Sequence, residues 1–421
     1  MNKKFRDLDL EGRLHMLRSD IPLNDDDVLT IRNTSSRTKF EDINRMIENA
    51  IGVYPLPLGI GTNFIINGKK YYVPMATEEP SVIAAASFAA KISSANGGFN
   101  ATVGASIVRG QIQVISVKDI QRVRQFIDAN KENLLEQANV NSRTIKAIDI
   151  QTRILYDKTL TFDKPMLIVE LFVDTKEAMG ANAVNSMCEI ISPEIERVAQ
   201  GKVILKILSN YATERIVTCE TTLRKEDLGG NKIVERMLHG YTFAYSDPYR
   251  AVTHNKGIMN GVDAVALATG QDFRALEAAA HAYASRNGYY RSLSIFSKNS
   301  NQDLVCKIEM PIVVGTVGGI TSVYPMAKLG LKILRVNSAS ELAMVIASVG
   351  LAQNIAALRA LSDEGIQQGH MKLHARNIAV AAGATGSKVD IVAKIMIEES
   401  KISLENAKQI LERARFDINE S

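Results

Sequence analysis

Four charged or ionisable residues stand in sequence surroundings that suit proton transfer at a carbonyl group. Glu79 belongs to a carboxylate pair between two apolar stretches, and Lys256 and Asp272 lie among small and apolar residues. Charges in such surroundings are either buried and paired or functional. Each one alone is more often a satisfied structural charge. Together with His370, however, they would suit polarising a carbonyl and moving protons.

The two histidines His370 and His374 are four residues apart and would share one face of a helix. A glycine precedes His370, which suits a mobile acid–base group. A metal site is the weaker interpretation, because the H-E-x-x-H arrangement is absent and no cysteine is nearby. An ordinary surface histidine is the alternative. We therefore expect no metal.

One glycine-containing turn is a candidate phosphate site. The segment 177–182, Glu-Ala-Met-Gly-Ala-Asn, follows an expected strand and opens an expected helix. The free amide groups and positive dipole end of such a helix favour a pyrophosphate. The alternative, which spacing alone favours, is a plain strand-to-helix turn. A second glycine pair, Gly59 and Gly61, fails as a dinucleotide fingerprint, because Phe64 occupies the third glycine position.

These residues lie in longer motifs that resemble those of the 3-hydroxy-3-methylglutaryl-coenzyme A reductases, specifically the soluble bacterial and archaeal class II enzymes. The resemblance covers nearly the whole chain and keeps the motifs in the family's order. The motifs are E-N-A-I-G at 48–52, E-E-P-S at 78–81, D-T-K-E-A-M-G-A-N at 174–182, D-P-Y-R at 247–250, H-N-K-G-I-M-N-G at 254–261, G-Q-D at 270–272, G-L-A-Q-N at 350–354 and G-H-M at 369–371.

The resemblance implies a four-electron reduction of 3-hydroxy-3-methylglutaryl-coenzyme A (HMG-CoA) to mevalonate and free coenzyme A, with two NADPH or NADH. The same enzyme working oxidatively in mevalonate catabolism is the alternative; another acyl-CoA enzyme and a non-catalytic homologue are further ones. The family usually has aspartate where this chain has Glu177. The implied site residues are Glu79, Lys256, Asp272 and His370 for catalysis, Ser81, Arg250, Asn260 and Gln353 for the substrate, and Glu177, Met179, Gly180, Ala181 and Asn182 for the cofactor.

The loop after the helix expected to end near Ala138 bears on the choice of cofactor. A family member specific for NADH would be expected to place an acidic residue here, to accept the ribose 2′-hydroxyl. Residues 138–144 contain no acid and offer Ser142 and Arg143, which can bind a 2′-phosphate. We therefore expect a preference for NADPH over NADH. An ordinary polar loop with one exposed arginine is the alternative.

The pattern of elements predicts an α+β protein in which a small domain is inserted into a larger, mainly helical one. Residues 106–209 have the β-α-β-β-α-β order of a split-βαβ unit, and the resemblance implies a ferredoxin-like nucleotide-binding domain. Residues 1–105 and 210–364 would form the large substrate-binding and dimerisation domain, and 365–421 a C-terminal helical flap. A hairpin is expected around Asn67-Gly68. Residues 120–137 and 257–286 are expected to be helical, the second mostly so.

Composition excludes several classes of protein. The chain has 421 residues, 46% of them hydrophobic, which excludes disorder over most of its length. A net charge of +4 argues against a general nucleic-acid binder. Three scattered cysteines argue against a disulfide framework. The start of the chain does not resemble a signal peptide, and no uncharged apolar run reaches ~18 residues. We expect a cytoplasmic homodimer, or a higher oligomer built from dimers, with no membrane or nucleic-acid partner.

Overall fold

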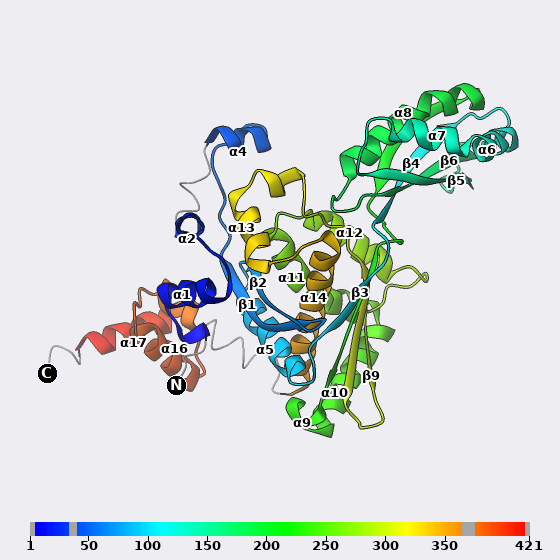
Figure 1. Ribbon diagram of the computed structural model, residues 1–421. Coiled ribbons are helices and arrows are strands. Elements are labelled where there is room, and N and C mark those ends of the chain that lie inside the picture. The colour runs from blue at the N-terminus through cyan, green and yellow to red at the C-terminus, as the bar shows by residue number, and fades with distance from the viewer. Residues whose placement is uncertain (1–4, 33–39, 364–374, 417–421) are drawn as a thin grey trace.

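Two four-stranded antiparallel sheets, each with its own hydrophobic cluster, organise the chain (Figure 1). The computed structural model describes residues 5–32, 40–363 and 375–416. One sheet has the strand order β3–β8–β10–β9, and the other has the order β5–β6–β4–β7. Strands β1 and β2 form a separate hairpin. The protein is therefore a mixture of helix and sheet, as the sequence predicts.

The larger hydrophobic cluster is formed by side chains of the first sheet, the hairpin and the long helices. Its central helix, α14, packs against α11 and α5. By length and composition α14 could cross a membrane, but 83% of its most apolar window is buried inside the protein. The elements of this part are β1 (Leu58–Ile66), β2 (Lys69–Ala76), α5 (Val82–Ser94), β3 (Asn100–Val103), β8 (Ile216–Leu223), α9 (Lys225–Leu228), α10 (Asn231–Ser246), α11 (Pro248–Ala268), α12 (Phe273–Ala284), β9 (Ser294–Lys298), β10 (Leu304–Pro311), η2 (Gly319–Ser322), α13 (Pro325–Leu334) and α14 (Ala339–Ser362).

The second sheet and its helices stand apart from the larger part, at the upper right of Figure 1. Along β4 every second residue is buried, because one face of the sheet is covered by helices. The order along the chain is strand, helices, two strands, helix, strand, as expected. The elements are β4 (Ile107–Ile115), α6 (Ile120–Ala129), α7 (Lys131–Asn139), β5 (Lys146–Leu155), β6 (Met166–Asp174), α8 (Ala181–Ala199) and β7 (Lys202–Ser209).

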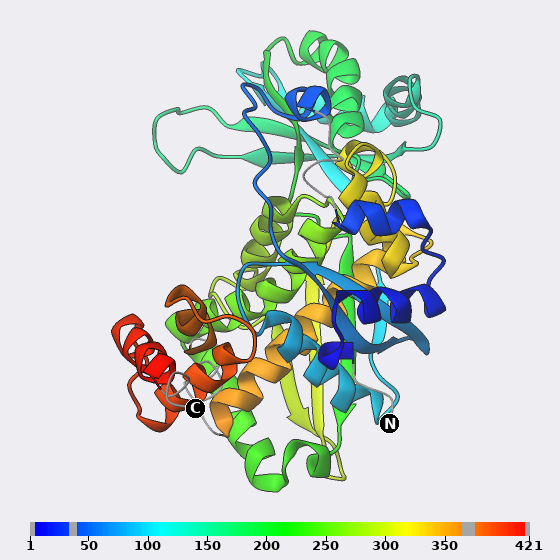
Figure 2. The same ribbon diagram turned by 90° about the vertical axis from the view of Figure 1, so that its left-hand side faces the viewer.

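The two ends of the described chain are helical. Helices α16 and α17 share a small hydrophobic cluster of their own at the lower left of Figure 2. Helix α2 begins at Asp25, where three aspartates face the positive end of the helix dipole. The elements are η1 (Phe5–Asp7), α1 (Leu10–Asp20), α2 (Asp25–Arg32), α4 (Phe40–Met46), α16 (Lys388–Glu398) and α17 (Leu404–Phe416).

The local expectations are confirmed at the hairpin and corrected in the helices. Asn67 and Gly68 both have positive φ, 48° and 77°, as a two-residue hairpin turn requires. The helix expected over 120–137 is two helices, because the chain leaves the helical conformation at Asn130. The stretch 257–286 is likewise divided, by a turn at Gly270 with φ of 67°. Strands β3, β8 and β9 are not among the elements that the sequence pattern predicts.

Candidate active site

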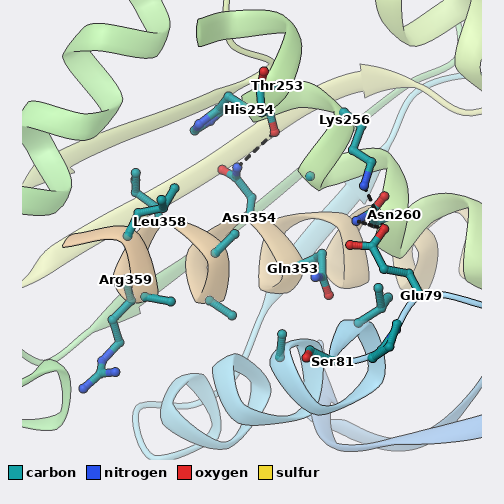
Figure 3. A pocket seen from close by; sticks show the side chains of 18 of the residues that line it. Glu79, Ser81, Thr253, His254, Lys256, Asn260, Gln353, Asn354, Leu358 and Arg359 are labelled. Atoms are coloured by element: carbon teal, nitrogen blue, oxygen red, sulfur yellow. Dashed lines mark hydrogen bonds and ion pairs between the residues drawn. The ribbon is translucent and has the colours of Figure 1, made fainter. Parts of the chain in front are cut away.

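A cavity of about 520 Å³ lies between α11, α14 and the start of α5 (Figure 3). The helices present side chains at intervals of three to four residues, so that Lys256 and Asn260 of α11 face it together. The segment that joins β2 to α5 brings Glu79 and Ser81 to the same space. Three segments that are distant in sequence are therefore brought together here.

An ion pair lies at the centre of this cavity. The Nζ atom of Lys256 lies 2.8 Å from Oε2 of Glu79, and the amide of Asn260 donates to the same oxygen at 3.3 Å. The side chains are 58% exposed for Lys256 and 37% for Glu79, so both can be reached from solvent. A fixed ammonium beside a carboxylate can stabilise an oxyanion and transfer a proton in one place.

Three other predicted substrate residues line the same cavity with unused polar groups. Ser81 has a left-handed backbone (φ 76°), and its hydroxyl does not cap α5. Such conformations are uncommon outside glycine and concentrate at functional sites. Oε1 of the buried Gln353 has no hydrogen-bond donor among the described residues. Arg250 brings a positively charged guanidinium group to the cavity, and burial lowers the pKa of that group. A ligand that offers a hydroxyl donor to Gln353 and a carboxylate or carbonyl acceptor to Ser81 and Arg250 would satisfy these groups.

A buried polar network beneath the cavity was missed in the sequence. Nε2 of His254 lies 2.8 Å from the hydroxyl of Ser294, which donates to Oδ1 of Asn354 at 2.8 Å. Burial, with a smaller effect of the Arg250 charge, lowers the pKa of His254 to about 3. This histidine is therefore neutral and ties α11 to α14. In the sequence, the only signal for His254 is that it shares one motif with Asn255 and Lys256.

A second cavity, of about 630 Å³, lies where the small sheet meets the large part of the chain. It is lined by Met179, Gly180, Ala181 and Asn182 at the start of α8, as the phosphate-site interpretation requires. Gly180 precedes the helix with φ of 90°, and neither a capping side chain nor an acidic residue occupies the first turn. The first amide groups of α8 are therefore available for an anion, which suits the pyrophosphate of a dinucleotide.

The loop 315–319 forms the opposite wall of this cavity. A Cβ atom on Gly315 would lie 2.7 Å from the backbone nitrogen of Met179, so only glycine allows this close approach. The amide of Gly315 donates to Oε1 of Gln271 at 2.9 Å, which fixes the loop against the end of α11.

Three predicted cofactor residues are placed differently. Glu177 directs its carboxylate to the start of α14, where Oε2 accepts from the amide of Ala339 at 2.6 Å. Ser142 and Arg143 belong to the turn that precedes β5. Ile145, two residues beyond Arg143, lines the second cavity. Because β5 pairs with β6, this turn and the loop that begins at Thr175 lie at the same end of the sheet.

The four predicted catalytic residues are not all gathered in one cavity. Asp272 lines the second cavity, where it caps α12 and pairs with Arg274 at 3.1 Å. Lys256 lies twelve residues before the end of α11, which is about 18 Å along the helix axis. His370 lies outside the described residues. Within the described ranges, no group of three or more histidine, cysteine or acidic side chains could hold a metal ion.

The chain matches known proteins along most of its length. The family model described as hydroxymethylglutaryl-coenzyme A reductase matches residues 9–375. A 3-hydroxy-3-methylglutaryl-coenzyme A reductase of Archaeoglobus fulgidus is 47% identical over 416 residues, 98% of this chain and 94% of that protein. A probable enzyme of the same name from Borreliella burgdorferi is 40% identical over 344 residues, 79% of this chain and 77% of that protein.

Solved structures agree with these relatives. A class II 3-hydroxy-3-methylglutaryl-CoA reductase from Streptococcus pneumoniae, bound to NADPH in open conformations, has a TM-score of 0.81 and 38% identity. The match covers 97% of this chain and 100% of that chain. A second structure of the reductase from the same organism has a TM-score of 0.82 at 38% identity, over 97% of this chain and 99% of that one.

Proposed function

The chain belongs to the hydroxymethylglutaryl-coenzyme A reductase family, and we propose that it reduces HMG-CoA to mevalonate and free coenzyme A with two reduced nicotinamides. The observation that carries this proposal is the Lys256–Glu79 pair in a cavity that also holds Asn260, Arg250 and Gln353. The names of the relatives favour the reductive direction over mevalonate oxidation.

Each charged residue has a step that suits its chemistry. When bound, the nicotinamide supplies the hydride for each two-electron reduction. Lys256 stabilises the oxyanion that develops at the thioester carbonyl. His370 protonates the departing coenzyme A thiolate, and Glu79 supplies the proton to the aldehyde oxygen in the second reduction. Asp272 lines the other cavity of its own chain, so it would adjust the charge around Lys256 and Glu79 of a second copy in a dimer.

Within one copy the substrate and cofactor are proposed to occupy separate cavities, and a dimer would bring the first cavity of one copy to the second cavity of the other for hydride transfer. Ser81, Arg250, Asn260 and Gln353 would hold the hydroxymethylglutaryl group in the first. In the second, Met179, Gly180, Ala181 and Asn182 would surround the dinucleotide, while Glu177 holds their loop in place. Residues 106–209 would then form the ferredoxin-like nucleotide-binding domain, 1–105 with 210–364 the substrate and dimerisation domain, and 365–421 the flap.

We also propose that NADPH is preferred, that the protein is a homodimer and that it works in the cytoplasm. The open amide groups of α8 support a dinucleotide phosphate, and the turn with Ser142 and Arg143 lies at the same end of the sheet. All three cysteines are free and buried, as a reducing compartment allows. Ile51 and Tyr54, fully and 90% exposed, offer an apolar contact to a second copy.

A steady-state assay in both directions, with NADPH and with NADH, tests the function. The expected result is oxidation of NADPH that depends on HMG-CoA and yields mevalonate in a ratio of two to one. Arg143→Ala should raise the Michaelis constant for NADPH and leave that for NADH nearly unchanged. A tenfold preference of the parent for NADH would overturn the assignment of the Ser142–Arg143 turn. No consumption of either nicotinamide with the thioester would overturn the function itself.

A further inference from the structure

Arg215 is an arginine with no exposed surface, located between the last strand of the small sheet and the start of β8. Its Nη1 atom donates to the hydroxyl of Thr175 at 3.2 Å, and Nη2 donates to the carbonyl of Val314 at 2.9 Å. Its Nε atom has no acceptor among the described residues. None of the ion pairs in the described part of the chain includes it. A buried charge without such a partner is costly, which calls for a role that an apolar side chain cannot fill.

The two groups that Arg215 joins are the starting points of both walls of the second cavity. Thr175 follows β6 and begins the loop 175–180, in which a Cβ atom on Gly180 would meet the Thr175 methyl at 2.3 Å. Val314 follows β10 and precedes Gly315, which touches the backbone of Met179. The guanidinium therefore ties the loop 175–180 to the glycine loop across from it.

The same loop is held at a second point by Glu177. Its Oε2 accepts from the amide of Ala339 at 2.6 Å and from the hydroxyl of Thr316 at 3.3 Å. The backbone carbonyl of Glu177 accepts from the amide of Thr316 at 2.9 Å. A carboxylate at the first amide of α14 also opposes the positive end of that helix dipole. The loop is thus fixed at Thr175 by Arg215 and at Glu177 by its contacts with Thr316 and Ala339.

We infer that Arg215 and Glu177 form a clasp that holds residues 175–180 in the conformation that binds the dinucleotide, so that both set cofactor affinity without touching the cofactor. The inference rests on the proposed function. Burial lowers the pKa of Arg215 to about 10, against the opposite effects of Glu177 and Asp174, so the side chain stays charged at neutral pH. Its positive charge lies beside Thr175, whose methyl group faces Gly180 at the start of α8, so it adds attraction for a phosphate there.

The test compares variants by NADPH binding and by kinetics. NADPH binding is followed through the fluorescence of the nicotinamide itself, because the chain has no tryptophan. Arg215→Met should raise the Kd and the Michaelis constant for NADPH about tenfold, the scale of one lost charge-assisted contact. The Michaelis constant for HMG-CoA should stay within about twofold, because that substrate uses the other cavity. Arg215→Lys, which keeps the charge but cannot reach both acceptors, should recover part of the loss.

Further variants separate the clasp from a general effect on folding. Thr175→Val keeps the methyl that touches Gly180 and removes the acceptor for Arg215, so it should raise the Kd for NADPH by about threefold. Glu177→Ala should weaken NADPH binding, and Glu177→Gln, which still offers an acceptor to Ala339, should weaken it less. Arg153→Met is the control for removing a partly exposed arginine elsewhere in the small domain. Arg153 pairs with Glu170 at 2.9 Å in the same sheet but does not contact the loop, and its loss should leave both Michaelis constants unchanged.

The outcomes distinguish this inference from the function on which it rests. Should Arg215→Met fail to fold, Thr175→Val and Glu177→Ala carry the test. An active parent whose variants bind NADPH as tightly as it does would overturn the clasp. Equal losses for NADPH and HMG-CoA would also overturn it, since they would show a general structural role. A parent that uses no reduced nicotinamide with HMG-CoA would overturn the function, and the clasp with it.

Discussion

At the scale of single residues, Lys256 is the group on which the proposed chemistry depends most. It lies 2.8 Å from Glu79 and is open to solvent, so its replacement removes charge from the site and little from the core. Lys256→Ala should keep the fold and lower turnover by roughly 10²–10³-fold, the effect of losing one oxyanion stabiliser. Steady-state turnover at saturating substrates is the measurement.

A second lysine–glutamate pair provides the control for this prediction. Lys298 lies 3.7 Å from Glu235, on elements outside both cavities. Lys298→Ala should leave turnover within about twofold, because partly exposed pairs contribute little to stability. Turnover of Lys256→Ala within threefold of the parent would contradict the role given to Lys256.

A carboxyl pair between α11 and α12 has a different consequence, for stability. Burial, followed by a hydrogen bond with Glu277, raises the pKa of Asp263 to about 8. Glu277 lies 2.6 Å from Nε2 of His281, and that hydrogen bond is the main cause of its lowered pKa. Nδ1 of His281 lies 2.6 Å from the hydroxyl of Tyr290. Asp263 is therefore protonated at neutral pH and can share its proton with Glu277.

The raised pKa of Asp263 fixes the sign of a pH effect. The folded chain keeps a proton that the unfolded chain releases above about pH 4, so stability is lost as pH rises towards about 8. Asp263→Asn offers a donor to Glu277 at every pH and lacks this loss. The thermal unfolding midpoint of the variant, measured from pH 6 to 9, should therefore rise relative to that of the parent up to about pH 8. Above that pH the difference between the two midpoints should stay constant. His254 contributes equally to the pH dependence of the parent and of the variant, so its contribution cancels in the comparison. Parallel pH profiles would contradict the prediction.

At the scale of elements, the sequence predicts what local patterns control. The alternation of inward-facing and outward-facing residues along β4 specifies that strand directly. The Asn67-Gly68 turn specifies the hairpin in the same way. The break at Asn130 could not be foreseen, because apolar periodicity continues through it in the second helix. Arg215 had no signal at all, since a single arginine before a strand gives no indication of burial. Its role depends on loops that are 40 and 99 residues away.

The start of α8 allows an element-scale prediction. Gly180 has φ of 90° and would bring a Cβ atom within 2.3 Å of the Thr175 methyl. Gly180→Ala should therefore weaken NADPH binding by tenfold or more and lower the thermal midpoint. Gly97→Ala is the control for backbone strain alone, because Gly97 has φ of 92° with open space around it. That control should lose about 1–2 kcal/mol of stability and bind NADPH normally. Equal NADPH affinity in both variants would contradict the prediction.

At the scale of the whole molecule, the separation of Lys256 from Asp272 matters most. The two residues line different cavities, and about 18 Å of helix lies between Lys256 and the end of α11. A symmetric dimer could bring the first cavity of one copy to the second cavity of the other, because a two-fold axis makes both contacts at once. The exposed Ile51 and Tyr54 give such a contact an apolar surface.

Complementation between two inactive variants tests this arrangement. Lys256→Ala and Asp272→Ala chains, each inactive alone, are co-expressed with different tags. If Lys256 of one copy works with Asp272 of the other, each mixed dimer has one intact site and one site lacking both residues. Random pairing makes half of the dimers mixed, so the activity should recover to about a quarter of the parent's. If both residues act within one copy, a mixed dimer contains no intact site and the mixture stays inactive.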